Sequence, residues 1–121
     1  MRPVSAPHPE TWLKVTPSGL FCEPGGFFID PTRAVDRAVI SHGHSDHARP
    51  GHAHVLATRE TLAIITQRMG EGRAGETQQA LALGDPLTIN GVRVWLRPAG
   101  HVLGSAQVCM EWQDSRAVVS G

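Results

Sequence analysis

The stretch Ala38-Val39-Ile40-Ser41-His42-Gly43-His44-Ser45-Asp46-His47 carries a short apolar run straight into a cluster of three histidines and one aspartate. The apolar run predicts a buried strand, and a strand that feeds a tight loop points alternate side chains the same way. His42 and His44 are therefore expected to converge on one ion, with Asp46 and His47 facing a neighbouring position. Imidazole and carboxylate ligands together suit zinc or a similar divalent ion. The pattern predicts half of a dinuclear metal site, and a solvated histidine-rich loop is the alternative.

The order His-x-His-x-Asp-His after a buried strand resembles the signature of the metallo-β-lactamase superfamily. This resemblance implies that His42 and His44 bind a first metal ion. It also implies that Asp46 and His47 bind a second ion, and that Asp46 has a catalytic role in orienting this ion and hydrogen-bonding the nucleophile. The implied cofactors are two divalent metal ions, zinc or manganese.

A later glycine-rich stretch, Pro98-Ala99-Gly100-His101-Val102-Leu103-Gly104-Ser105-Ala106, resembles the loop that carries the next ligand of this superfamily. His101 is accordingly expected to be the third ligand of the first ion. The second ion then has only two ligands in this chain, and the end of the chain at 118–121 resembles the residues immediately before the bridging aspartate of the superfamily. We therefore expect an amino-terminal piece of a longer enzyme, covering one half of an αββα sandwich.

A narrower resemblance, to the bacterial ligase-associated DNA exonucleases, runs from Trp12 to Gly121. These proteins are also called mRNA 3′-end processing factors and are similar to the β-CASP nucleases. The stretches that carry the resemblance are Pro17–Cys22, Ile29–Pro31, Val35–His42, Asp46–His52 and Leu87–Val92. It implies hydrolysis of phosphodiester bonds in DNA or RNA, in DNA repair or RNA processing, with a DNA ligase and a helicase as partners. The β-CASP region would lie beyond Gly121, so this piece alone is expected to be inactive.

Two alternatives remain open from the residues alone. The first is another hydrolase on the same fold that cleaves a thioester, a lactone or a β-lactam, because one fold hosts many reactions. The second is a metal-binding fragment without catalytic activity. The metal motif does not distinguish among these three possibilities, whereas assays on single-stranded DNA, RNA and a thioester would.

The composition indicates more about the organisation of the chain than about its substrate. Its 121 residues suffice for one core. Eleven basic and eleven acidic residues cancel, so net charge does not indicate a nucleic-acid partner. Cys22 and Cys109 stand far apart in apolar surroundings, which favours free buried thiols and a reducing compartment. The chain lacks a signal-peptide pattern and any apolar run approaching the ~18 residues of a membrane span. The expectation is a cytoplasmic protein without a membrane partner.

Local patterns predict an α/β (α+β) fold of mostly mixed or antiparallel sheet with one or two helices. Residues 1–11 contain three prolines and are expected to form an extended arm, and residues 12–121 a partial metallo-β-lactamase domain. Thr58 is expected to cap a helix that runs to Met69 and stops at Gly70. Strands are expected at Trp12–Val15, Gly19–Cys22, Phe27–Ile29, Ala38–Ser41, Leu87–Ile89, Val92–Leu96, Ala106–Trp112 and Arg116–Val119.

Four further local features lead to separate expectations. Asn90-Gly91 between two alternating runs is typical of a hairpin. In its second strand, one face is expected to carry Val92, Val94 and Leu96, and the other Arg93, Trp95 and Arg97. A short helical turn is expected from Ser45, and residues 70–75 are expected to form a loop. His54, which precedes the apolar run Val55-Leu56-Ala57, is interpreted as a residue at the edge of a strand, and neither His52 nor His54 is expected to have a direct role in the site.

Overall fold

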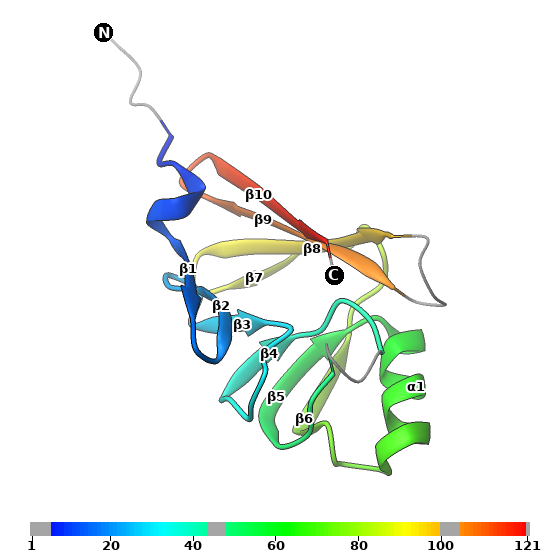
Figure 1. Ribbon diagram of the computed structural model, residues 1–121. Helices are drawn as coiled ribbons and strands as arrows, with labels where there is room; N and C mark the ends of the chain where they lie inside the picture. The colour runs from blue at the N-terminus through cyan, green and yellow to red at the C-terminus, as the bar shows by residue number, and fades with distance from the viewer. Residues whose placement is uncertain (1–5, 44–47, 100–104, 121) are drawn as a thin grey trace, which may run out of the picture.

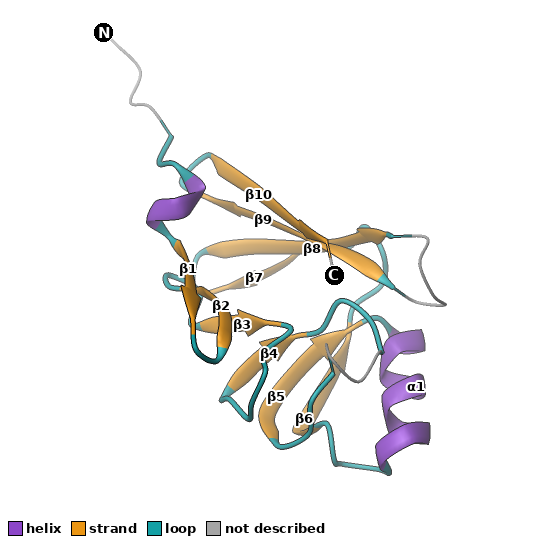
Figure 2. Ribbon diagram, in the orientation of Figure 1, coloured by secondary structure: helices purple, strands orange, loops and turns teal. Residues whose placement is uncertain are grey.

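The computed structural model describes residues 6–43, 48–99 and 105–120, and its elements are arranged in layers (Figures 1 and 2). The described residues form a six-stranded sheet, a four-stranded sheet and the α-helix α1 (Arg59–Met69). One face of the six-stranded sheet packs against the four-stranded sheet, and its other face packs against α1. This arrangement confirms the predicted α+β class with mixed and antiparallel sheets.

The six-stranded sheet changes from antiparallel to parallel along its width. Its strands, in spatial order, are β1 (Leu13–Thr16), β2 (Gly19–Cys22), β3 (Phe27–Ile29), β4 (Arg37–Val39), β5 (His52–Ala57) and β6 (Gly75–Ala80). The pairs β1–β2 and β2–β3 are antiparallel, whereas β3 to β6 run parallel. Parallel strands have their carboxyl ends at one edge of the sheet, so the residues that follow Val39, Ala57 and Ala80 lie at that common edge.

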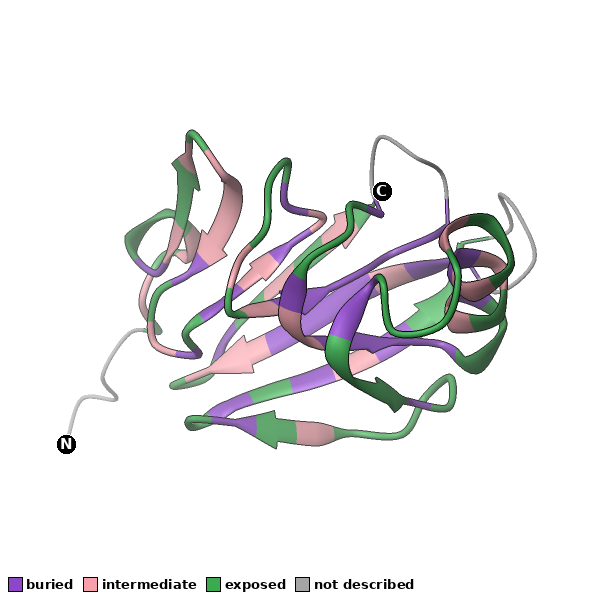
Figure 3. Ribbon diagram, turned by 90° about the horizontal axis from the view of Figure 1, so that it is seen from below, coloured by how far each residue is buried: buried purple, intermediate pink, exposed green. Residues whose placement is uncertain are grey.

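The four-stranded sheet is antiparallel throughout. It contains β7 (Leu87–Ile89), β8 (Val92–Pro98), β9 (Ala106–Trp112) and β10 (Ser115–Ser120), in the spatial order β10-β9-β8-β7. Asn90 and Gly91 join β7 to β8 with φ angles of 48° and 83°, the positive values that a two-residue hairpin turn requires. Val92, Val94 and Leu96 are fully buried, and the alternate residues of β8 face outward, as predicted. Buried and exposed positions alternate along strands of the structure in Figure 3.

Helix α1 begins and ends where the sequence predicts. The Thr58 side chain accepts a hydrogen bond from the backbone N–H of Thr61 at 3.2 Å, which satisfies one of the free donors of the first turn. Ile65 is buried against the six-stranded sheet. Gly70 follows the last helical residue with a φ of 101°, a conformation that side chains with a β-carbon rarely adopt.

The main hydrophobic core lies between the two sheets. Its largest fully buried side chains are Trp12, Phe27, Leu96 and Met110. The indole Nε1–H of Trp12 donates a 2.9 Å hydrogen bond to the buried Ser115 Oγ at the start of β10, so the polar atom of this large side chain is satisfied inside the core. A second cluster lies under α1 and comprises Ala38, Ile40, Ala48, Val55, Ala57, Ile65 and Ala74.

Strand β6 was not predicted, because its sequence is polar. The interval 70–75 was expected to be a loop, yet β6 begins at Gly75 and pairs in parallel with β5. Five of its six residues are exposed, as an edge strand allows, since pairing with one neighbour requires backbone hydrogen bonds rather than an apolar face. Its position is therefore determined by β5 and not by its own side-chain pattern.

The start of the chain differs in part from the expected extended arm. Residues 1–5 lie outside the described residues, whereas Pro9–Thr11 form one turn of 3-10 helix. His8 caps this turn, because its Nδ1 accepts a hydrogen bond from the backbone N–H of Glu10 at 3.2 Å. The first strand begins at Leu13, one residue later than predicted.

Two composition-based expectations can be compared with the described residues. Cys22 and Cys109 are both free and buried, as predicted, and burial raises the pKa of the Cys22 thiol to about 11. In the described part of the chain, no helix is long and apolar enough to cross a membrane.

Candidate metal centre

One of the five predicted metal ligands lies within the described residues. His42 follows β4 at the carboxyl edge of the parallel strands and is 2% exposed. His44, Asp46, His47 and His101 lie outside the described residues, and so does the helical turn expected from Ser45. Among residues 6–43, 48–99 and 105–120, no three His, Cys, Asp or Glu side chains form a group able to hold a metal ion. The ligand set therefore stays a prediction from the sequence.

The backbone directly before His42 is held by Asp30, a residue that follows β3. Asp30 Oδ1 accepts a 2.7 Å hydrogen bond from the backbone N–H of Ser41, and Oδ2 accepts a 2.5 Å hydrogen bond from the Ser41 hydroxyl. Ser41 is fully buried, and the backbone N–H of Asp30 donates to the Val39 carbonyl at 3.0 Å. Three hydrogen bonds thus attach Asp30 to the end of β4 and orient the backbone that enters the motif.

In the sequence, Asp30-Pro31 indicates the end of the strand Phe27–Ile29 and does not reveal the contact of Asp30 with Ser41. Its φ is +47°, a left-handed conformation that aspartate tolerates better than most residues. An aspartate between a strand and a proline is the one local signal that pointed to a special backbone position. The partner of that aspartate is distant in the sequence, so the hydrogen bonds themselves were not predictable.

The residues that flank 100–104, the stretch expected to carry His101, lie beside the residue that precedes His42. The backbone N–H of Ala106, at the start of β9, donates a 2.7 Å hydrogen bond to the carbonyl of Ser41. The N–H of Ala99 donates to the Ser105 carbonyl at 3.1 Å, which closes the base of the segment 100–104. The two segments that were predicted to share a metal ion therefore begin from neighbouring positions, although they belong to different sheets.

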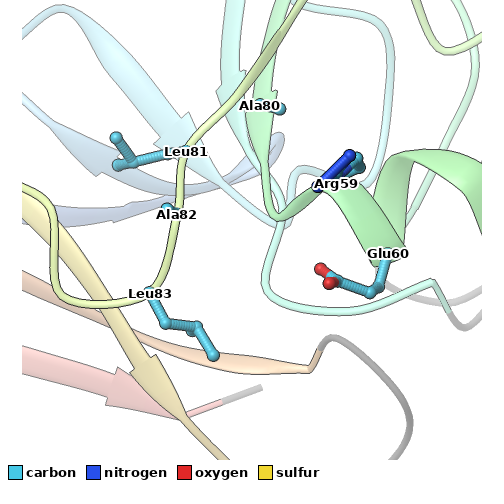
Figure 4. Close-up of a pocket in the computed structure, with 6 residues that line it drawn as sticks. All are labelled: Arg59, Glu60, Ala80, Leu81, Ala82 and Leu83. Carbon is cyan, nitrogen blue, oxygen red and sulfur yellow. The ribbon is translucent and has the colours of Figure 1, made fainter.

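A hollow of about 340 Å³ opens at the carboxyl edge of the parallel strands (Figure 4). One wall is the start of α1 and the other is the chain that follows β6. The six lining residues are Arg59, Glu60, Ala80, Leu81, Ala82 and Leu83. Its volume falls within the range of small-ligand sites, of which roughly 300–1,000 Å³ is typical. One wall is charged and the other apolar, and Leu83 is 45% exposed.

His52 and His54 lie away from this edge of the sheet. Both belong to the amino-terminal half of β5, whereas His42 follows the carboxyl end of the neighbouring parallel strand β4. His52 is 1% exposed, and its Nδ1 accepts a 3.1 Å hydrogen bond from the backbone N–H of Val35. Burial lowers the pKa of His52, an effect that the backbone of Arg49 partly offsets. The two histidines are thus separate from the candidate centre.

Comparison with known proteins finds a curated relative and solved structures of similar fold. No protein-family model matches the chain. A protein named "Probable DNA ligase" from Opitutus terrae is 32% identical over 99 residues, which make up 77% of this chain and 9% of that protein. The crystal structure of a protein of unknown function from Enterococcus faecalis V583 covers 70% of this chain and 24% of its own, with a TM-score of 0.58 and 18% identity. This structural likeness shows a shared fold.

Proposed function

We propose that this chain belongs to a metal-dependent hydrolase of the metallo-β-lactamase superfamily that cleaves phosphodiester bonds in nucleic acid. The observation that carries the proposal is the hydrogen bond from Ala106 to Ser41, because it joins the bases of the two segments that bear the predicted ligands. The name of the Opitutus terrae relative supports a role in DNA metabolism, with a DNA ligase as partner.

The predicted donor set fits two divalent cations. His42, His44 and His101 would hold one ion, and Asp46 and His47 would contribute to holding the second. Imidazoles and a carboxylate are the usual nitrogen and oxygen ligands of zinc, and the burial of His42 matches that of a ligand at the bottom of a site. When bound, two such cations act as Lewis acids and supply positive charge to the oxygens of a phosphodiester.

The residues of the chain itself position the ligands and the substrate. Asp30 orients Ser41, and thereby sets the direction in which the backbone enters His42. In the hollow at the same edge of the sheet, Arg59 offers a cation to a backbone phosphate, and Leu81 and Leu83 offer apolar surface to a sugar or base. A nucleic-acid strand is both charged and apolar along its length, so it matches the two walls of the hollow.

The proposal is tested by measuring bound metal and nuclease activity together in the full-length protein. We expect zinc or manganese to support cleavage of single-stranded DNA or RNA, and His44→Ala and Asp46→Ala to abolish cleavage. His54→Ala is the matched control, since it removes an imidazole at the other end of the sheet, where Nδ1 contacts Thr77 Oγ1 at 2.7 Å. That variant is expected to keep both metal and activity.

Each rival function predicts a different result in the same experiment. Cleavage of a thioester, lactone or β-lactam without cleavage of either nucleic acid would replace the nuclease proposal by another hydrolase. Metal binding without turnover of any of these substrates would indicate a binding protein. Nuclease activity that survives both His44→Ala and Asp46→Ala, with metal content unchanged, would refute the assignment of the site.

A further inference from the structure

Arg68 connects the last turn of α1 to both ends of the segment 44–47. Its guanidinium donates one hydrogen bond to the carbonyl of Gly43 and another to the carbonyl of Ala48 at 2.9 Å. These two residues flank the segment directly on either side. The Arg68 side chain therefore bridges Gly43, the entry to the segment, and Ala48, its exit. The segment between them carries three of the predicted ligands.

The entry side is packed against the same helix. A β-carbon added to Gly43 would lie 2.7 Å from Cγ2 of Ile64 and 3.2 Å from its Cβ, so only glycine fits this close to α1. Gly43 and Ala48 are both buried. Gly43 thus contacts α1 through its backbone carbonyl and lies too close to Ile64 to carry a β-carbon, and Ala48 contacts α1 through the second hydrogen bond of Arg68.

Arginine is suited to this bridge in a way that lysine is not. The guanidinium is planar and presents several N–H donors in a fixed geometry, so two donors can hold two carbonyls at a set separation. An ammonium group is a point charge on a flexible stem and does not fix two acceptors relative to each other. The separation of the segment's two ends is consequently set by the arginine.

We propose that Arg68 is a positioning residue for the metal centre, which holds the two ends of the segment 44–47 together and so increases the affinity of the centre for metal. The inference rests on the proposed function, because it takes His44, Asp46 and His47 as ligands. Groups that orient metal ligands through hydrogen bonds change metal affinity by roughly 10- to 100-fold when they are removed. A bridge across the ligand segment is expected to act at the lower end of that range.

A simpler role for Arg68 would be charge stabilisation of the helix end. A cation in the last turn interacts favourably with the helix dipole, and a lysine at the same position does so as well. Arg68→Lys therefore separates the two roles, since it keeps the charge at the helix end and removes the bidentate bridge. Arg68→Gln removes both, and Arg73→Lys, in the loop after α1, controls for an arginine-to-lysine change outside the bridge.

The test measures zinc affinity by competition with a chromophoric chelator in full-length wild-type, Arg68→Lys, Arg68→Gln and Arg73→Lys proteins. We expect Arg68→Lys and Arg68→Gln to bind zinc about tenfold more weakly than wild type, and Arg73→Lys to bind like wild type. We also expect amide hydrogen exchange across 43–48 in metal-free Arg68→Lys to rise about tenfold, with the strands unchanged.

The outcomes separate this inference from the proposed function. Wild-type zinc affinity in Arg68→Lys would overturn the role of Arg68 while leaving the metal centre in place. Unchanged exchange across 43–48 in the metal-free variant would overturn the bridge without reference to metal. A wild-type protein that binds no zinc or manganese would refute the proposed function, and with it the effect of Arg68 on affinity, even if the exchange result showed a bridge.

Discussion

Removal of the Asp30 carboxylate is expected to be among the most destabilising single changes near the candidate centre. In Asp30→Ala, the buried N–H and hydroxyl of Ser41 lose the acceptors that lie 2.7 and 2.5 Å away in the native protein. The new alanine also has to adopt the φ of +47° that residue 30 has in this fold. In this variant, the lost hydrogen bonds and the backbone strain therefore both lower the free energy of unfolding.

The expected loss follows from these contributions. Hydrogen bonds to a charged group contribute about 1.5–3 kcal/mol each, and a left-handed conformation costs an alanine about 1–2 kcal/mol. Because Asp30 is only half-buried, we take the lower end of each range and expect a loss of about 4 kcal/mol. Asn tolerates the same backbone and keeps one acceptor oxygen, so Asp30→Asn should lose about 1–2 kcal/mol. Ser41→Ala removes the shorter bond alone and should lose a similar amount.

The free energies of unfolding are measured by urea titration of the metal-free proteins, followed by tryptophan fluorescence. Domains of this kind are stable by roughly 5–15 kcal/mol, so a loss of 4 kcal/mol is readily resolved. The decisive comparison is between Asp30→Ala and the other two variants. An Asp30→Ala protein within about 0.5 kcal/mol of wild type, the usual range for an inconsequential surface change, would refute the role given to this carboxylate.

Two further predictions concern buried polar groups away from the centre. Burial lowers the pKa of His52, so the unfolded chain binds a proton more readily than the folded protein as the pH falls below about 6.5. The free energy of unfolding should therefore decline below about pH 6.5 and stay unaffected by this group at higher pH. His52→Gln keeps an acceptor for the N–H of Val35, and urea titrations from about pH 8 to pH 5 should show a shallower decline; equal slopes in both proteins would count against this cause. Trp12→Phe leaves the buried Ser115 hydroxyl without its indole donor and should lose about 1–3 kcal/mol in thermal melts. Adding Ser115→Ala to that variant should restore part of the loss, and no recovery would indicate that lost packing dominates.

Elements that depend on neighbouring residues were predicted closely. The limits of α1 follow from a capping threonine and a terminating glycine, both of which act within one turn of helix. The β7–β8 hairpin follows from Asn90-Gly91 for the same reason. Strand β6 was missed because its stability comes from pairing with β5, and a polar edge strand carries no pattern of its own.

By itself, the sequence predicted a kind of chemistry and the segments expected to carry it, since ligand type and spacing are local properties of the chain. It also determined the apolar alternation that buries one face of β8. Only the tertiary structure decided how these segments meet. The hydrogen bonds of Asp30 with Ser41, of Ala106 with Ser41, and of Arg68 with Gly43 and Ala48 join residues far apart in the chain. Such contacts form only when the sheets and the helix pack together, because folding alone brings those backbone groups within bonding distance.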